Sequence, residues 1–274
     1  MKRIVTIQDI SCLGKCSLTV ALPLISAMGV EAAIIPTAVL STHTMFKNFT
    51  CKDLDDQIVP ITDHWKQEGF HFDGIYTGYL ASAAQVKTVM SVIDKLKTDD
   101  TMIIVDPAMA DNGKMYPAFD SDFPKEMAKL CGMADVILPN ITEASFLTGT
   151  PYKEQYDEAY IRELLHKLAA LGSKTVILKG VQLDGKYGVL CYDAASDSYS
   201  AYWHEKLPVG YHGTGDIFSS VFVGARMRGK TIEESVRIAA DYTVECIRVT
   251  NDRKGSNWYG VDFETVIPKL VEKL

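Results

Sequence analysis

A glycine-rich turn near residue 213 is the part of the sequence best suited to phosphate chemistry. Gly213, Thr214, Gly215 and Asp216 lead directly into the apolar segment IFSSVFVGARMRG, whose spacing predicts a helix. Glycines let the backbone approach an anion closely, and the free amides and dipole at a helix start attract negative charge. Asp216 would lie in the first turn, where its carboxylate could take a proton from a substrate hydroxyl. The turn therefore predicts an anion hole beside a general base, although ordinary capping by Thr214 explains the same residues.

A pair of acidic residues follows the short buried strand predicted from Met102 to Val105. Asp106 closes that strand, and Asp111 stands in the next turn. Carboxylate oxygens placed there could gather Mg²⁺ directly or through water. Asp-Pro and Asp-Asn-Gly are also common turn formers, so the same residues fit a simple loop.

Two further strand ends carry polar residues. Asn140 and Glu143 follow the strand predicted from Val136 to Leu138 at capping-box spacing, so Glu143 could orient metal-bound water or cap a helix. Lys179 follows the strand from Thr175 to Leu178, where its ammonium group could neutralise a polyphosphate or simply face solvent. Taken alone, both positions fit an ordinary strand end as well as a site.

The segment from Gly224 to Thr231 (GARMRGKT) matches the P-loop pattern letter for letter. A working P-loop follows a strand and opens a helix, whereas this match closes the helix that begins near Asp216. We therefore interpret it as a chance match, with Gly229 as a helix stop and Lys230 as a solvated end.

The composition of the chain argues against several classes of protein. The 274 residues are 47% hydrophobic, and 28 Lys and Arg against 35 Asp and Glu give a net charge of −7. An acidic chain of this kind has no global electrostatic reason to bind nucleic acid. The amino-terminal residues do not form a signal peptide, and the apolar region from Ser17 to Leu40 is too interrupted to span a membrane. We expect a cytoplasmic protein without membrane contact, whose six cysteines stay reduced and serve as small core residues.

Short apolar runs alternate with helical patterns, and no repeat or linker divides the chain, so we expect one domain over residues 1–274. Near-continuous apolar strands such as MIIVD and TVILK indicate an α/β sheet covered on both faces. Ligands bind such sheets at the carboxyl ends of the strands. The expected strands are Lys2 to Gln8, Ala32 to Val39, Gly74 to Tyr79, Met102 to Val105, Val136 to Leu138, Thr175 to Leu178, and an antiparallel pair, Tyr187 to Tyr192 with Tyr199 to Trp203. The expected helices are Cys16 to Met28, Leu54 to Gln67, Ser82 to Lys97, Pro124 to Leu130 and Ile161 to Leu171, with a mostly helical last third.

The strand-end residues and the glycine-rich turn occur in this order in a known family. The chain resembles, essentially end to end, the ribokinase-like (PfkB) kinases and, within them, the vitamin B6 kinases. The most specific match is GTGDIFSSVFVGARMRG, and the segments Thr77 to Ser82, Asp106 to Tyr116 and Pro139 to Gly149 also fit the B6 subgroup. The resemblance implies a ribokinase-like three-layer α/β/α sandwich with a mostly parallel central sheet, and a homodimer.

The resemblance also implies a reaction. The γ-phosphoryl group of ATP would pass to the 5′-hydroxymethyl group of pyridoxal, pyridoxine or pyridoxamine, with Asp216 as the base and Gly213 to Gly215 as the anion hole. Asp106 and Glu143 would act on the nucleotide phosphates and Mg²⁺, directly or through water, and a need for a monovalent cation stays open. The other nucleotide-contacting positions that it implies are Asp111, Tyr116, Asn140 and Lys179.

The resemblance places an acceptor site near residue 43. The segment from Ser41 to Thr44 is similar to a Ser-Asn-His-Thr stretch that lies against the B6 ring in the family. Thr44 and His43 would then touch the acceptor, although His43 taken alone fits a packed turn histidine. Tyr79 could stack on the ring or wall it off.

The amino-terminal end departs from the family pattern. Asp9 stands where the family has a serine that contacts the substrate, unless Ser11 takes that place through a shift. An aspartate could accept a hydrogen bond from the ring hydroxyl or pair with a cationic amine or pyridinium. This departure indicates tuning toward pyridoxamine or pyridoxine.

Two alternatives remain at this point. The same fold and chemistry could serve hydroxymethylpyrimidine, a thiamin precursor, instead of a B6 vitamer. The chain could also be a non-catalytic ligand-binding protein on this fold, but Asp216 behind an intact Gly-Thr-Gly turn argues against that.

Overall fold

A nine-stranded sheet forms the middle layer of the protein, and the computed structural model describes all of residues 1–274. The strand order is β11-β10-β9-β8-β5-β4-β1-β2-β3. Neighbouring strands from β9 to β2 are parallel. At the two edges, β10 is antiparallel to β9, β11 is antiparallel to β10, and β3 is antiparallel to β2. The strands are β1 (Arg3–Leu13), β2 (Glu31–Thr42), β3 (Cys51–Asp53), β4 (Gly74–Thr77), β5 (Met102–Val105), β8 (Val136–Ile137), β9 (Thr175–Leu183), β10 (Lys186–Asp193) and β11 (Ser198–His204).

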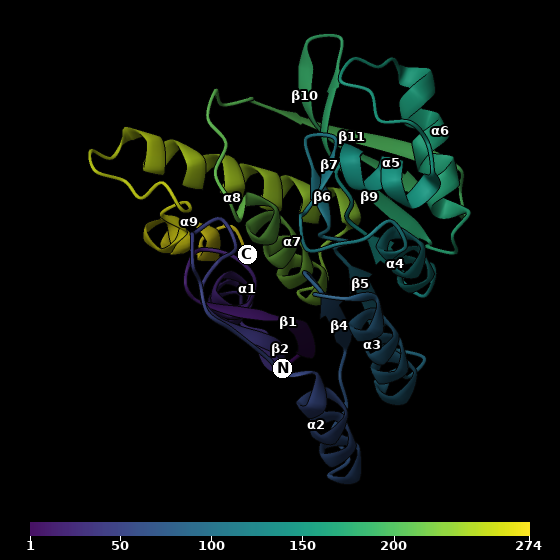
Figure 1. Ribbon diagram of the computed structural model, residues 1–274. Helices are drawn as coiled ribbons and strands as arrows, with labels where there is room; N and C mark the ends of the chain where they lie inside the picture. The colour runs from purple at the N-terminus through teal and green to yellow at the C-terminus, as the bar shows by residue number, and fades with distance from the viewer.

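Helices cover both faces of this sheet, which explains why its strands are apolar on both sides (Figure 1). One core of 34 buried residues lies on one face, and a second core of 31 lies on the other, so neither face is left to solvent. Helices α2 to α6 pack in succession on the first face, and α1, α7, α8 and α9 cover the second (Figure 1). The helices are α1 (Leu18–Ala27), α2 (Asp55–Gln67), α3 (Ala83–Leu96), α4 (Phe123–Gly132), α5 (Ile141–Thr148), α6 (Glu158–Ala169), α7 (Thr214–Met227), α8 (Ile232–Asp252), η1 (Phe263–Val266) and α9 (Ile267–Val271).

This arrangement confirms the predicted three-layer α/β/α sandwich with its mostly parallel sheet. The predicted helices and strands are present, and β10 and β11 form the predicted antiparallel pair. Sequence reasoning missed the short edge strand β3 and the small hairpin of β6 (Ala110–Asp111) and β7 (Lys114–Met115). It also ended β1 too early, because β1 continues to Leu13 and pairs with β2 over that added length.

The segment with the P-loop pattern ends a helix, as predicted. Helix α7 stops at Met227, and Gly229 has a positive φ of 80° just beyond it. Thr231 then caps α8 through its side chain.

The prediction that all six cysteines are core residues is wrong for two of them. Cys12 and Cys51 are exposed, because they lie near the end of β1 and on the edge strand β3. All six thiols are free. No helix of the structure is both long and apolar enough to cross a membrane.

Candidate active site

The start of helix α7 offers free backbone amides to an anion. Gly213 occupies the N-cap position with a positive φ of 81°, and no side chain caps the helix. A Cβ on Gly213 would overlap the carbonyl oxygen of Lys15, so only glycine fits here. The capping role considered for Thr214 is wrong, because its hydroxyl donates instead to the carbonyl oxygen of Tyr211 at 3.1 Å. The first amides of α7 therefore keep their donors free for a ligand.

Asp216 stands in the first turn of α7, and its carboxylate is held from outside the helix. The backbone amide of Ser17 donates to Asp216 Oδ2 at 3.0 Å. Burial raises the pKa of Asp216 to about 7, and the negative charges of Asp106 and Asp9 add to that shift. A carboxyl group with a pKa near neutrality is well matched to take a proton from an alcohol.

Lys179 brings positive charge to the same helix start. It follows the parallel part of β9, and its Nζ donates to Asp106 Oδ2 at 2.8 Å. Ser219 on α7 donates to the same oxygen. Lys179 Nζ also lies 3.8 Å from the point where a Cβ of Gly215 would stand. Burial disfavours the ammonium charge, but the carboxylates of Asp106 and Glu143 outweigh it and hold the pKa of Lys179 above its usual value.

Asn140 and Glu143 form the capping box that their spacing predicts. The Asn140 side chain accepts from the amide of Glu143 at 2.9 Å, and Glu143 Oε2 accepts from the amide of Asn140 at 2.7 Å. Glu143 Oε1 accepts from the amide of Met109 at 3.3 Å, so this buried carboxylate joins the loop after β5 to helix α5. Burial raises the pKa of Glu143 to about 8.

These bonds limit how a metal ion could be held. Both oxygens of Glu143 accept backbone amides, and Asp106 Oδ2 is shared by Lys179 and Ser219. No group of three or more His, Cys, Asp or Glu residues is placed to hold a metal ion. The residues fit a Mg²⁺ ion that is carried by phosphate oxygens and reached through water, because Mg²⁺ keeps several waters when it is bound with nucleotides.

The β6–β7 hairpin brings Asp111 and Tyr116 toward this edge of the sheet. Asn112 and Gly113 both have positive φ, as a two-residue hairpin turn requires, and the amide of Gly113 donates to the Thr142 hydroxyl at 3.0 Å. Asp111 is exposed, and its carboxylate bonds back to Asn112. Burial raises the pKa of Tyr116, with the charges of Glu143 and Asp111 adding to the effect.

Asp9 and Ser11 lie in the carboxyl-terminal half of β1, and Tyr79 lies just beyond the end of the adjacent strand β4. Ile7 of β1 pairs with Thr77 of β4, so Asp9 and Tyr79 each lie two residues beyond the last pair of these adjacent parallel strands. Ser11 Oγ donates to Asp9 Oδ2 at 3.1 Å. Burial and then the charge of Asp9 raise the pKa of Tyr79 to about 12.

His43 is a packed histidine with both ring nitrogens in use. Its Nε2 lies 2.9 Å from the carbonyl oxygen of Tyr259, and the amide of Met45 donates to Nδ1 at 3.3 Å. The ring packs against His212 with 4.4 Å between centroids. Because both nitrogens are in use, a ligand could contact His43 only through the carbon atoms of its ring. Thr44, the next residue, is exposed.

Sequence reasoning missed two serines at this site. Ser17 holds Asp216 through its backbone, and Ser219 shares Asp106 with Lys179. A serine before the apolar run at Leu18 is a helix-start signal, so Ser17 could have been marked as an N-cap. Its contact with Asp216 could not, because the two residues are 199 positions apart.

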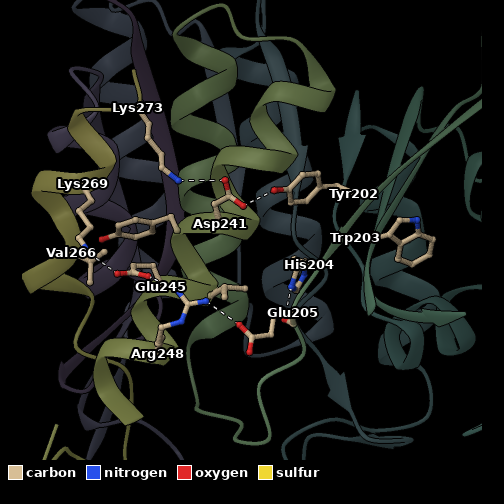
Figure 2. Close-up of a pocket in the computed structure, with 12 residues that line it drawn as sticks. Tyr202, Trp203, His204, Glu205, Asp241, Glu245, Arg248, Val266, Lys269 and Lys273 are labelled. Carbon is tan, nitrogen blue, oxygen red and sulfur yellow. Dashed lines mark hydrogen bonds and ion pairs between the residues drawn. The ribbon is translucent and has the colours of Figure 1, made fainter. Parts of the chain in front are cut away.

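A separate cavity of about 460 Å³ lies between β11, α8 and the carboxyl-terminal helices (Figure 2). None of the predicted site residues lines it. Its charged groups largely pair with one another, as in the Tyr202–Asp241 and Arg248–Glu205 contacts of 2.6 and 2.9 Å. It is therefore not part of the candidate active site.

Known proteins resemble this chain in both sequence and fold. Residues 21–261 match the family model described as phosphomethylpyrimidine kinase. A Bacteroides thetaiotaomicron protein provisionally named a phosphomethylpyrimidine kinase, in its crystal form with pyridoxal, is 37% identical. That match covers 98% of this chain and 95% of that one with a TM-score of 0.93. Pyridoxal kinase from Lactobacillus plantarum is 29% identical, with 99% and 97% of the two chains covered and a TM-score of 0.90. Pyridoxal kinase from Dictyostelium discoideum is 26% identical over 251 residues, which span 84% of this chain and 80% of that protein.

Proposed function

From the premise that this chain belongs to the phosphomethylpyrimidine kinase family, we propose that it phosphorylates the 5′-hydroxymethyl group of a B6 vitamer with ATP. The alcohol oxygen of the acceptor attacks the γ-phosphorus, the hydroxyl proton goes to Asp216, and ADP leaves. The named pyridoxal kinases among its relatives and the pyridoxal bound by a 37% identical protein support this acceptor class.

The observation that carries the proposal is the position of Asp216. Its carboxylate lies at the start of α7, beside amides that no side chain caps, and its pKa is about 7. The base that accepts the proton and the donors that meet the charged phosphoryl group are thus supplied by consecutive residues. Positioning and charge stabilisation account for most of the catalysis of phosphoryl transfer.

The nucleotide side is built from Lys179, Asp106 and the α5 capping box. The ammonium group of Lys179 reaches the helix start, where it would meet phosphate oxygens of ATP. A Mg²⁺ ion on the triphosphate would neutralise phosphoryl charge, with Asp106 and Glu143 contacting its waters. Asp111 and Tyr116 would border the nucleotide from the β6–β7 hairpin, and Asn140 from the start of α5. A homodimeric state and a cytoplasmic location belong to the same proposal, and the need for a monovalent cation stays open.

The acceptor side is built from the ends of β1, β2 and β4. Tyr79 would wall the pyridine ring with its flat face. Thr44 and the ring of His43 would contact it from the loop after β2, and Asp9 and Ser11 from the end of β1. The hydroxyl oxygen that receives the phosphoryl group must then lie between these residues and Asp216.

Hydroxymethylpyrimidine is the second candidate acceptor, because the matching family model is named for that chemistry. The same base and anion hole would serve it. The acceptor-facing residues, and not the nucleotide site, would decide between the two ring systems.

The test is an ADP-release assay with Mg-ATP and each of pyridoxal, pyridoxine, pyridoxamine and hydroxymethylpyrimidine. Asp216→Asn is the matched variant, because the amide keeps the size of the side chain and an oxygen for the Ser17 bond. We expect turnover on at least one B6 vitamer and its loss in the variant, with nucleotide binding retained. Turnover on hydroxymethylpyrimidine alone would overturn the B6 assignment, and full activity of Asp216→Asn would overturn the role of the base.

A further inference from the structure

Asp9 is a buried carboxylate with no cation beside it. The residue is 5% exposed, and its hydrogen bonds come from neutral donors, the side chain of Ser17 and the hydroxyl of Ser11, which lies 3.1 Å from Oδ2. His43 is the basic group that acts on its charge, but both nitrogens of that ring are bonded elsewhere and burial lowers its pKa. Buried charges in proteins are normally paired, because an uncompensated one is costly. Asp9 therefore has neutral hydrogen-bond donors but no cation paired with its charge.

The carboxylates near Asp9 make a positive charge at this end of the site more favourable. Asp216, Asp106 and Glu143 add three more carboxylates to the same edge of the sheet, and Lys179 is already paired with Asp106. Lys15, which belongs to the loop after β1, is bonded to Asp262 and Glu264 instead. Neither lysine is paired with Asp9.

Asp9 lies on the acceptor side of the site, so its negative charge would act on the acceptor. Asp9 and Tyr79 extend from adjacent parallel strands, each two residues past the Ile7–Thr77 pair. The register between β1 and β2 shifts opposite Asp9, between Gln8 and Ile10, a type of irregularity that re-aims side chains at sheet ends. The charge of Asp9 also contributes to the raised pKa of Asp216.

We infer that Asp9 is a specificity-determining residue that selects an acceptor carrying an exocyclic ammonium group, so that pyridoxamine is preferred over pyridoxine and pyridoxal. This inference rests on the proposed function. A protonated primary amine supplies both a full positive charge and hydrogen-bond donors to the carboxylate. The hydroxymethyl group of pyridoxine supplies a donor without the charge. The aldehyde of pyridoxal supplies neither and turns an oxygen toward the carboxylate.

The experiment compares pyridoxamine with pyridoxine, which differ by an amine in place of a hydroxyl at one position. The kcat/KM ratio of the two acceptors is measured in wild type, Asp9→Asn and Asp9→Ser, with Mg-ATP saturating. We expect wild type to favour pyridoxamine and both variants to lower the ratio by about 10- to 150-fold, the scale of a hydrogen bond to a charged group. Asp100→Asn is the matched control, because it removes one exposed carboxylate at the amino end of β5 and should leave the ratio unchanged.

The possible outcomes separate the two proposals. If wild type uses no B6 vitamer, the proposed function fails, and calorimetric binding of pyridoxamine and pyridoxine still tests Asp9 by the same ratio. If wild type phosphorylates B6 vitamers but favours pyridoxine or pyridoxal, the inference is wrong while the function stands. An equal loss for all acceptors in Asp9→Asn and Asp9→Ser would likewise overturn it, because a merely structural role would not distinguish an amine from a hydroxyl.

Discussion

The backbone amide of Ser17 donates a hydrogen bond to Asp216 Oδ2 at 3.0 Å, across 199 residues of sequence. The start of α1 thus orients the carboxylate at the start of α7. Ser17 has a φ of 49°, a conformation that non-glycine residues adopt rarely, which indicates that its amide is held in place by the surrounding structure. Asp216 keeps Oδ1 for a proton from the acceptor.

The pH dependence of catalysis should reflect the pKa of Asp216. Its carboxylate acts as a base only when ionised, and its pKa is raised to about 7. We expect kcat/KM to fall about tenfold for each pH unit below that value and to level off above it. Initial rates from pH 5.5 to 8.5 at saturating Mg-ATP measure this. A flat profile over that range would exclude Asp216 as the base with this pKa.

Removal of the Lys179 charge should lower both stability and activity. Lys179→Met leaves Asp106 buried and without its cation, which typically costs about 3–5 kcal/mol of unfolding free energy. The KM for ATP should also rise, because the ammonium group at the helix start is lost. Urea unfolding and steady-state kinetics measure the two effects.

A double variant separates the stability effect from the catalytic one. Lys179→Met with Asp106→Asn removes both charges, so it should recover much of the lost stability without recovering activity. Lys174→Met is the control, because Lys174 pairs with Asp135 at an exposed position. Recovery of activity in the double variant would contradict a phosphate-binding role for Lys179.

Gly213→Ala should damage the anion hole. An alanine there would have to adopt a left-handed φ and displace the carbonyl of Lys15. Loss of one such donor typically lowers kcat by about 10²–10³-fold. Gly229→Ala is a matched control, because its φ of 80° is the same kind of strain but nothing lies within 4 Å of the added Cβ.

The Gly213→Ala and Gly229→Ala variants should therefore differ in activity as well as in stability. Gly229→Ala should cost about 1–2 kcal/mol of unfolding free energy and keep its kinetics. Equal kinetic losses in both variants would show that the close approach of Gly213 to Lys15 is unimportant. Thermal unfolding and kcat measurements on the same preparations decide this.

The α5 capping box should matter for nucleotide binding as well as stability. Asn140→Ala removes the cap of α5 and the bond from Asn140 Nδ2 to the carbonyl of Ala110 at 2.9 Å. We expect a loss of about 1 kcal/mol and a raised KM for ATP, because the β6–β7 hairpin loses an anchor. Thr231→Ala breaks the capping box of α8, away from the site, and should cost similar stability with unchanged KM. An unchanged KM in Asn140→Ala would remove Asn140 from the nucleotide site.

Much of the fold follows from local patterns in the sequence. Apolar runs such as MIIVD bury residues on both faces, and that alone requires a sheet between two helical layers. The Asn140–Glu143 capping box was predictable because its partners are three residues apart. The β6–β7 hairpin also has a local signal, because Asn112-Gly113 is a pair typical of two-residue hairpin turns.

The sequence by itself determined which residues close each strand and that a flexible glycine turn precedes an acidic helix start. Those features depend on neighbours in the chain, so spacing reveals them. Only the tertiary structure decided that Ser17 holds Asp216, that Lys179 pairs with Asp106, and that Thr214 bonds to Tyr211 instead of capping α7. It also decided that Asp9 lies buried beside Tyr79 without a cation. These relationships join strand ends that parallel pairing brings to one edge of the sheet, and no local pattern records which distant groups meet there.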